Sequence, residues 1–384
     1  MHRIHVARIF LPALCVVSLS ACWAPRPRAP LPTAAQPSLL AARCGNGVCQ
    51  GIESSANCPA DCPQTQPTKS PQPLPTVPPA ASLFATGTGV VYMGVMMHLE
   101  GWEDDHNQNR FAAHAEQIRS TADLFEKYGA KLTLESKDVT EGVSRWGDNV
   151  LLEMEQRGHG VGVHADLGGN LSDDCARLSS ELRAEREQLE SLGVRVRHVS
   201  GNVSHCDWIA ATIDAGYSFT TGIVAYGVMS MPAANRPPEF RNCKSPAACH
   251  DLFPPELEDR LHPWRPASGS DWLTHDPNGK LVILASGQGI ACAQEQTAGQ
   301  DTRNGCLFEP ADVQAMMGVL DQALELAAPD QVNILYFSWS LGSPLDPLVL
   351  EEWLKAVEPY VKTGRVQWKT LPEMYDAYVA WEGG

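Results

Sequence analysis

The sequence is poor in basic residues for its length. Its 384 residues include 29 Lys and Arg against 45 Asp and Glu, so the formal net charge is −16. A surface of this sign repels phosphate groups, and we therefore expect neither nucleic acid nor an anionic membrane surface as a partner. The charge is compatible with a neutral or cationic glycan, and equally with a surface that serves solubility alone.

Two sequence signatures are also missing. No Gly-x-Gly-x-x-Gly follows the first expected strand, which disfavours a dinucleotide-binding fold. The cluster of four cysteines in residues 44–62 lacks paired Cys-x-x-Cys knuckles, which disfavours zinc there without excluding it. Six further cysteines lie in the main domain, and even numbers in both groups predict disulfides and an oxidising compartment. We expect the pairs Cys243–Cys249 and Cys292–Cys306.

The N-terminus carries a targeting signal. Arg3 and Arg8 precede an apolar run over residues 9–19. This run is too short to span a membrane and is typical of a signal peptide. It ends in Leu-Ser-Ala-Cys22, which resembles a bacterial lipobox. This resemblance implies cleavage before Cys22, lipidation of its thiol and a lipid-anchored protein of the cell envelope, periplasmic or surface-exposed. An ordinary secretory signal is the alternative.

The rest of the chain divides by composition. After the signal peptide (1–21) we expect a Pro/Ala-rich tether (22–43), a small disulfide-rich module (44–62), a Pro-rich linker (63–80) and a main domain (81–384). The module is too small to bury a core, so cross-links must hold it.

Strands and helices alternate along the main domain. Apolar runs predict strands at 89–99, 131–135, 194–200, 217–221, 281–285, 332–339 and 365–370. The stretch 158–169 gives the third strand, after Gly158 ends the preceding helix in the left-handed conformation. Helical spacing predicts helices at 112–128, 149–156, 173–192, 208–215, 311–327, 348–361 and 373–381, and residues 228–278 form an insertion. Alternation with apolar strands indicates an α/β fold with a parallel sheet covered by helices, and about seven repeats favour a barrel.

Three successive strands end in polar side chains. Alternation places His98 and Glu100 on one face of the first strand, and His164 and Asp166 on one face of the third; Glu135 ends the second. Carboxyl ends of barrel strands meet at one edge, where such folds keep their chemistry. Because a lone buried carboxylate is costly, the set predicts either a hydrogen-bond network or a metal, with zinc favoured and cobalt, nickel or manganese accepted.

The order and spacing of these elements, with the turn Gly-His-x-x-Gly-x-His over residues 158–164, resemble the polysaccharide deacetylase family (carbohydrate esterase family four). The resemblance covers roughly residues 81–381. It implies a distorted (β/α)7 barrel that removes acetyl groups from amino sugars or xylan with a metal-bound water. Glu100 falls where the family has its metal-binding Asp, and His164 matches one family His.

The sequence departs from the family at several motif positions. Leu99 replaces the catalytic-base Asp, and Gly168 stands where the second metal-binding His belongs. The Arg of the third motif, near residues 199–202, and the His of the last motif, near 337–339, are also missing.

We therefore predict a divergent, metal-dependent polysaccharide deacetylase with a rebuilt site. His98, Glu100 and His164 are the expected metal ligands, Asp166 or Glu135 the expected general base, and His205 the expected proton donor to the leaving amine. We expect a monomer acting on a polysaccharide.

Other interpretations stay open. The metal centre could be degenerate, leaving a glycan-binding lipoprotein with stacking platforms drawn from its tryptophans, Trp102, Trp264, Trp272 and Trp339. The same carboxylates could also serve a metal-independent enzyme such as a lyase or epimerase. His205 could be a loop histidine beside a disulfide. We expect structural roles for His250 and His262 and surface positions for His106 and His114.

Overall fold

The computed structural model describes residues 87–99, 103–167, 174–245, 248–289, 308–341 and 346–383. The predicted signal peptide, tether, cysteine module and linker lie outside these residues, as do Glu100, Trp102, Gly168 and the expected Cys292–Cys306 pair. Among the helices in the described ranges, none combines the length and apolar character needed to cross a membrane.

The main sheet contains nine strands, and every pairing between them is parallel. Its strands are β1 (Val91–Leu99), β2 (Leu132–Ser136), β3 (Gly160–His164), β4 (His198–Ser200), β5 (Phe219–Thr220), β8 (Val282–Ile283), β9 (Gly287–Gly289), β10 (Asn333–Ser340) and β11 (Val366–Trp368). They run in the order β8-β5-β4-β3-β2-β1-β10-β9, with β11 paired to the start of β1.

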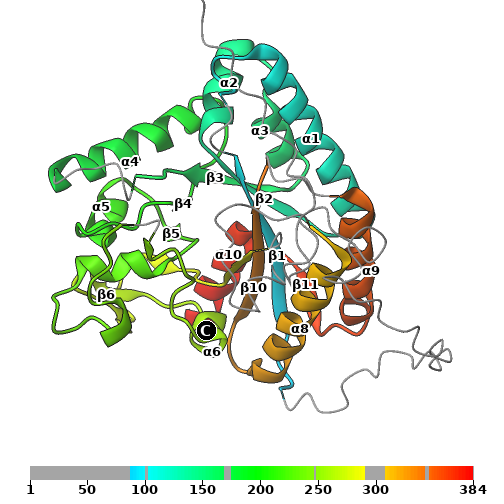
Figure 1. Cartoon of the computed structure of the whole chain (residues 1–384). Coiled ribbons are helices and arrows are strands. Elements are labelled where there is room, and N and C mark those ends of the chain that lie inside the picture. The colour runs from blue at the N-terminus through cyan, green and yellow to red at the C-terminus, as the bar shows by residue number, and fades with distance from the viewer. Residues whose placement is uncertain are drawn as a thin grey trace, which may run out of the picture. The chain divides into compact units, whose positions relative to one another are not determined.

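The sheet curls so that its two ends meet in one segment of chain. β8 borders β5, β9 borders β10, and only residues 284–286 separate β8 from β9. Backbone bonds from Leu284 N to Thr220 O and from Tyr336 N to Ser286 O continue this bridge. With β8 and β9 counted as one position and β11 left aside, seven strand positions thus follow one another around the curled sheet (Figure 1). The predicted distorted, seven-repeat α/β fold is confirmed, and the short strands β4, β5, β8 and β9 are its distorted part.

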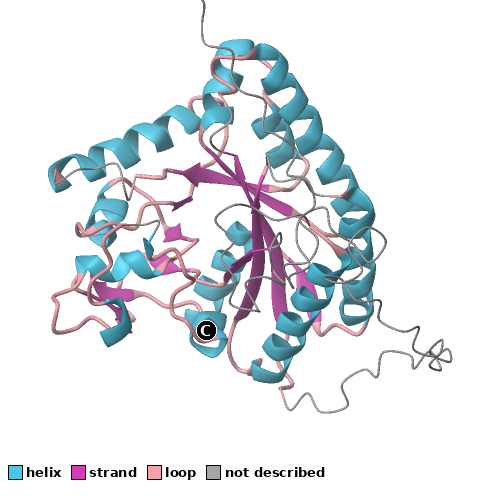
Figure 2. Ribbon diagram, viewed as in Figure 1, coloured by secondary structure: helices cyan, strands magenta, loops and turns pink. Residues whose placement is uncertain are grey.

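Helices cover the sheet (Figure 2). They are α1 (Gln108–Lys127), α2 (Asp138–Trp146), α3 (Val150–Gln156), α4 (Cys175–Glu190), α5 (Trp208–Asp214), α6 (Leu257–Leu261), α8 (Pro310–Leu326), α9 (Pro347–Lys362) and α10 (Leu371–Glu382).

The left-handed residue predicted before the third strand is Gly158, with φ of 88°. Helix α2 was not predicted, because Gly142 and several β-branched residues weaken its helical signal. Packing favours it instead: a Cβ on Gly142 would lie 2.5 Å from the Phe111 ring.

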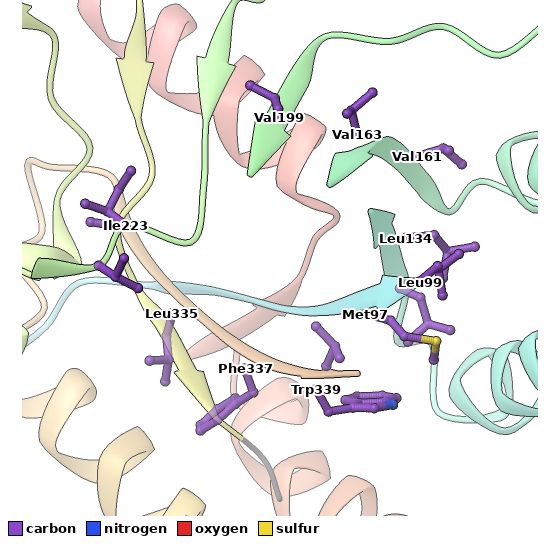
Figure 3. Close-up of a cluster of buried hydrophobic side chains, with 14 of the residues drawn as sticks. Met97, Leu99, Leu134, Val161, Val163, Val199, Ile223, Leu335, Phe337 and Trp339 are labelled. Atoms are coloured by element: carbon purple, nitrogen blue, oxygen red, sulfur yellow. The ribbon is translucent and has the colours of Figure 1, made fainter. Parts of the chain in front are cut away.

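The large core lies between the strands and the covering helices. Alternate strand residues such as Met97, Leu134, Val163 and Val199 point into it (Figure 3). Because side chains of a strand alternate between its two faces, the residues between these, among them His98, must face the inside of the curled sheet.

A second, smaller apolar cluster lies on the other face of the strands. It joins Met96, Phe219 and Tyr336 to side chains of α10, among them Leu371 and Met374. Helix α10 therefore supplies an apolar floor on this side of the sheet.

The predicted insertion holds short elements of its own. These are η1 (Ala225–Ser230), η2 (Pro238–Phe240), α6 and the antiparallel pair β6 (Pro266–Ser268) and β7 (Asp271–His275). The expected disulfide Cys243–Cys249 is present, and a second one joins Cys175 to Cys206. These two confirm the prediction of disulfides in the main domain.

Candidate metal centre

Three neighbouring strands bring His98, Glu135 and His164 together at their carboxyl ends. His98 of β1 lies opposite Glu135 of β2 in the sheet register. One potential ligand atom from each of the three side chains lies within 4.8 Å of the other two. The His98 Nε2 atom is 3.3 Å from Glu135 Oε2, and the ring centroids of His98 and His164 are 4.1 Å apart.

Glu135 is fully buried. Its Oε1 accepts a hydrogen bond from Thr221 Oγ1 at 2.6 Å and lies 3.3 Å from His198 Nε2. Burial alone would raise the pKa of Glu135, but the imidazoles of His198 and His98 outweigh it and hold that pKa well below its usual range. The site therefore contains a carboxylate anion whose Oε2 atom faces His98.

His164 is held in one orientation by the next strand. Its Nδ1 lies 2.7 Å from Ser200 Oγ of β4, which fixes the orientation of the ring. A histidine that ligates a metal commonly has its other ring nitrogen fixed in this way. His164 is buried, whereas the side chain of His98 is 21% exposed, which gives the cluster a path to solvent.

The three residues fit a divalent ion. Buried His98 Nε2 and Glu135 Oε2 make no hydrogen bond, although they lie 3.3 Å apart. Ligand atoms about 2.1 Å from a tetrahedral zinc ion are about 3.4 Å from one another, so this spacing matches two ligands of one ion. Two imidazoles and a carboxylate also form a donor set that zinc prefers.

The other residues predicted for the site lie in different surroundings. Glu100 is outside the described residues. Asp166 follows β3 with φ of 47°, its side chain is 54% exposed, and its Oδ2 is 3.1 Å from Lys137 Nζ. His205 lies beside the Cys175–Cys206 disulfide, with Nε2 3.7 Å from Cys206 Sγ. This position also fits the alternative of a loop histidine near a disulfide.

The prediction from sequence missed His198, Ser200 and Thr221, which contact the cluster. His198 and Ser200 flank Val199 in β4, and this is the same alternation that singled out the end of the third strand. That pattern is the signal that could have found them. Thr221 comes directly after the two-residue strand β5, where no periodicity can be read.

Gly162 makes room for His198. A Cβ on Gly162 would lie 2.3 Å from His198 Cε1 and Nε2, far closer than any van der Waals contact. The missing side chain on β3 thus lets an imidazole from β4 reach Glu135 on β2.

Three of the four tryptophans proposed as stacking platforms are packing residues. Trp264, Trp272 and Trp339 are at most 9% exposed, so a sugar ring cannot stack on them, and that part of the glycan-binding alternative is wrong. The fourth, Trp102, lies outside the described residues.

The predictions for the other histidines hold in part. His250, for which a structural role was expected, is exposed. His106 is exposed, and His262 Nδ1 lies 3.2 Å from Val332 O, a structural contact. His114 is not a surface residue: only 14% of its side chain is exposed, and its Nδ1 lies 2.7 Å from Oδ1 of the buried Asp104.

Comparisons with known proteins give weak similarities of fold. No protein-family model matches the chain, and no curated protein matches it. A probable polysaccharide deacetylase from Pseudomonas aeruginosa PAO1 is 12% identical with a TM-score of 0.49, over 76% of this chain and 91% of that one. The Puue allantoinase is 10% identical with a TM-score of 0.48, over 76% and 90%.

A 4-alpha-glucanotransferase from Thermococcus litoralis is 14% identical with a TM-score of 0.44, over 75% of this chain and 40% of that one. These solved structures carry different activities at similar scores. None of them assigns a reaction to this chain, and its function is inferred from the geometry of the site.

Proposed function

We propose that the protein is a metal-dependent hydrolase that removes acetyl groups from a polysaccharide, with His98, Glu135 and His164 holding a divalent ion. The observation that supports this most is the pair of buried atoms without hydrogen bonds, His98 Nε2 and Glu135 Oε2, at the spacing of two ligands. Zinc fits the donor set, and cobalt, nickel or manganese are also compatible. Glu100, predicted as a ligand, stays a prediction.

Bound there, a divalent ion would supply Lewis acidity and a water of lowered pKa. The chain's own part is to orient the ligands and to move protons. Ser200 and Thr221 hold His164 and Glu135 in place. We propose Asp166 as the general base, because its carboxylate is accessible and lies two residues beyond His164. Glu135 serves as a ligand in this proposal, and His205 stays a prediction as proton donor.

Metal content tests the proposal. The purified protein is expected to hold about one divalent ion per chain, measured by elemental analysis, as the three-residue site implies. His164→Ala should lose that ion, because it removes one ligand. His106→Ala is the matched control and should retain it, since His106 is exposed and outside the cluster. Equal, negligible metal in wild type and His164→Ala would exclude a metal enzyme.

Acetate release tests the reaction. Acetylated chitooligosaccharides, acetylated xylan and peptidoglycan cover N- and O-linked acetyl groups. Activity on one of them should be lost with a chelator and restored by the metal. A metal-binding protein that releases acetate from none of these substrates would contradict the proposed reaction.

A metal-independent carbohydrate-active enzyme, such as a lyase or epimerase, is the second candidate. It is favoured by one observation: each oxygen of Glu135 lies 3.3 Å from an imidazole, which is an acid–base arrangement in its own right. Turnover that survives complete removal of metal would select it.

The cellular setting is also a proposal. We infer a lipid-anchored protein of the cell envelope from the lipobox resemblance at Cys22. Replacement Cys22→Ser should move the protein from the membrane fraction to the soluble fraction, and unchanged fractionation would contradict the anchor.

A further inference from the structure

His198 is a buried residue with an unusual environment. It is 0% exposed, and its Nε2 lies 3.3 Å from Glu135 Oε1. The two residues are not on neighbouring strands, because β3 lies between β2 and β4. The contact is possible only because Gly162 of β3 has no side chain at the place where the imidazole passes.

Two stacked aromatic rings, Phe219 and Tyr375, fix the position of this imidazole. His198 stacks on Phe219 with ring centroids 4.6 Å apart and an interplanar angle of 13°. Phe219 stacks in turn on Tyr375 of α10, at 4.9 Å and 15°. The guanidinium of Arg197 lies 5.5 Å from the centre of the Tyr375 ring. A ring held by a stack of this kind cannot rotate or withdraw without disturbing the floor of the site.

The two oxygens of Glu135 therefore have different surroundings. Oε1 lies beside both His198 Nε2 and the Thr221 hydroxyl, whereas Oε2 faces His98 and makes no hydrogen bond. The hydrogen bond from Thr221 and the adjacent His198 ring fix the plane of this carboxylate, so that Oε2 faces the cluster.

We propose that His198 is a positioning residue that, together with Thr221, holds Glu135 Oε1 and so turns Oε2 toward the metal. The proposal rests on the proposed metal site and goes beyond it, because it assigns a role to a residue outside the ligand set. Partners of metal ligands in this position typically change metal affinity 10- to 100-fold when they are replaced. Gly162 is part of the same arrangement, because its lack of a side chain makes room for the His198 ring.

Two substitutions at one position separate the 3.3 Å polar contact of the ring from its packing. His198→Phe keeps an aromatic ring against Phe219 but has no N–H, whereas His198→Gln keeps an N–H donor without the ring. We measure the affinity for Zn²⁺ by competition with a chromophoric chelator, and for Co²⁺ by its visible absorption. His198→Phe should bind about 10- to 100-fold more weakly than wild type. His198→Gln should recover affinity to within about threefold.

The matched control is His159→Gln. His159 is also a buried histidine, but its Nδ1 accepts the backbone N–H of Leu132 at the start of β2, outside the cluster. This variant should melt at a lower temperature with unchanged metal affinity. Loss of stability alone then cannot explain a loss of metal at His198.

The results separate two failures. Wild-type affinity in folded His198→Phe, or equal losses in His198→Phe and His198→Gln, overturn the positioning role while leaving the metal site intact. A wild-type protein that binds neither ion overturns the metal site and the positioning role together. If His198→Phe does not fold, Gly162→Ala takes its place. That variant keeps the imidazole but displaces it, and it should weaken binding to a similar extent.

Discussion

Replacing Gly162 with alanine should destabilise the protein, although glycine to alanine is often stabilising in regular structure. The added Cβ would lie 2.3 Å from His198 Cε1 and Nε2 and 2.7 Å from Cδ2. Carbon atoms in contact are about 3.5–4.0 Å apart, so the ring would have to withdraw by more than about 1 Å. Phe219, which stacks on the ring, and Tyr375, which stacks on Phe219, restrict that movement. Overpacking of this kind costs about 1–3 kcal/mol.

Urea denaturation of the metal-free protein measures this cost. In a domain of this size each kcal/mol also lowers the melting temperature by about 2–4 °C. Gly318→Ala is the matched control: Gly318 lies in α8 with nothing within 4 Å of the new Cβ. That replacement should stabilise the protein by roughly 0.5–1 kcal/mol, because alanine favours a helix.

A double variant identifies the cause. Gly162→Ala combined with His198→Ala removes the ring that the new methyl group meets, so the two changes should cost less together than the sum of the two apart. We expect a coupling energy of about 0.5–3 kcal/mol, the range for residues in contact. Wild-type stability in Gly162→Ala, or strict additivity in the double variant, would refute the steric reasoning.

Three further predictions concern stability away from this contact. Replacing both Cys175 and Cys206 with serine should lower the free energy of unfolding by roughly 3–4 kcal/mol in urea titrations, since their disulfide closes a loop with a sequence separation of 31. Unchanged stability would show that the cross-link adds nothing. Burial raises the pKa of Glu185 to about 8 from 4.5. Its carboxyl group therefore binds its proton more tightly in the folded state, and stability should fall as the pH rises from 4.5 toward 8. Glu185→Gln should flatten that decline in melting temperature, and an unaltered profile would contradict the assignment. Tyr336→Phe leaves the N–H of Gly222 without its acceptor and should cost about 1–3 kcal/mol in urea titrations; a neutral result would show that the N–H finds another partner.

Most of the fold follows from local patterns. The apolar runs and the glycine that ends the helix before the third strand are properties of short segments, and they locate the strands of the main sheet other than β9 to within a few residues. Helix α2 and the short elements of the insertion could not be predicted in this way. Their sequences favour no regular structure, and contacts with distant residues, such as Phe111 against Gly142, decide it.

The candidate site was predictable in part, because only some of its features depend on a single strand. Alternation along single strands indicates that His98, Glu135 and His164 face the same side. It does not indicate which of them meet, because this depends on the register between strands. That register places Glu135 directly opposite His98. Alternation also places His198 and Ser200 on one face of the strand predicted at 194–200, but it does not indicate that His198 reaches Glu135 across an intervening strand.

The pairings of β1 set the order in which the barrel can fold. This strand comes first in the domain, yet Val91 pairs with Asn333 of β10 and with Val366 of β11, close to the end of the chain. As a ribosome releases the chain, almost the whole domain is synthesised before β10, the partner of one edge of β1, exists. Contacts this distant in sequence slow folding and leave an apolar strand edge exposed to aggregation. A chain cut short before β10 would leave one edge of β1 without its partner, so residues 333–384 are as necessary to the barrel as β1 itself.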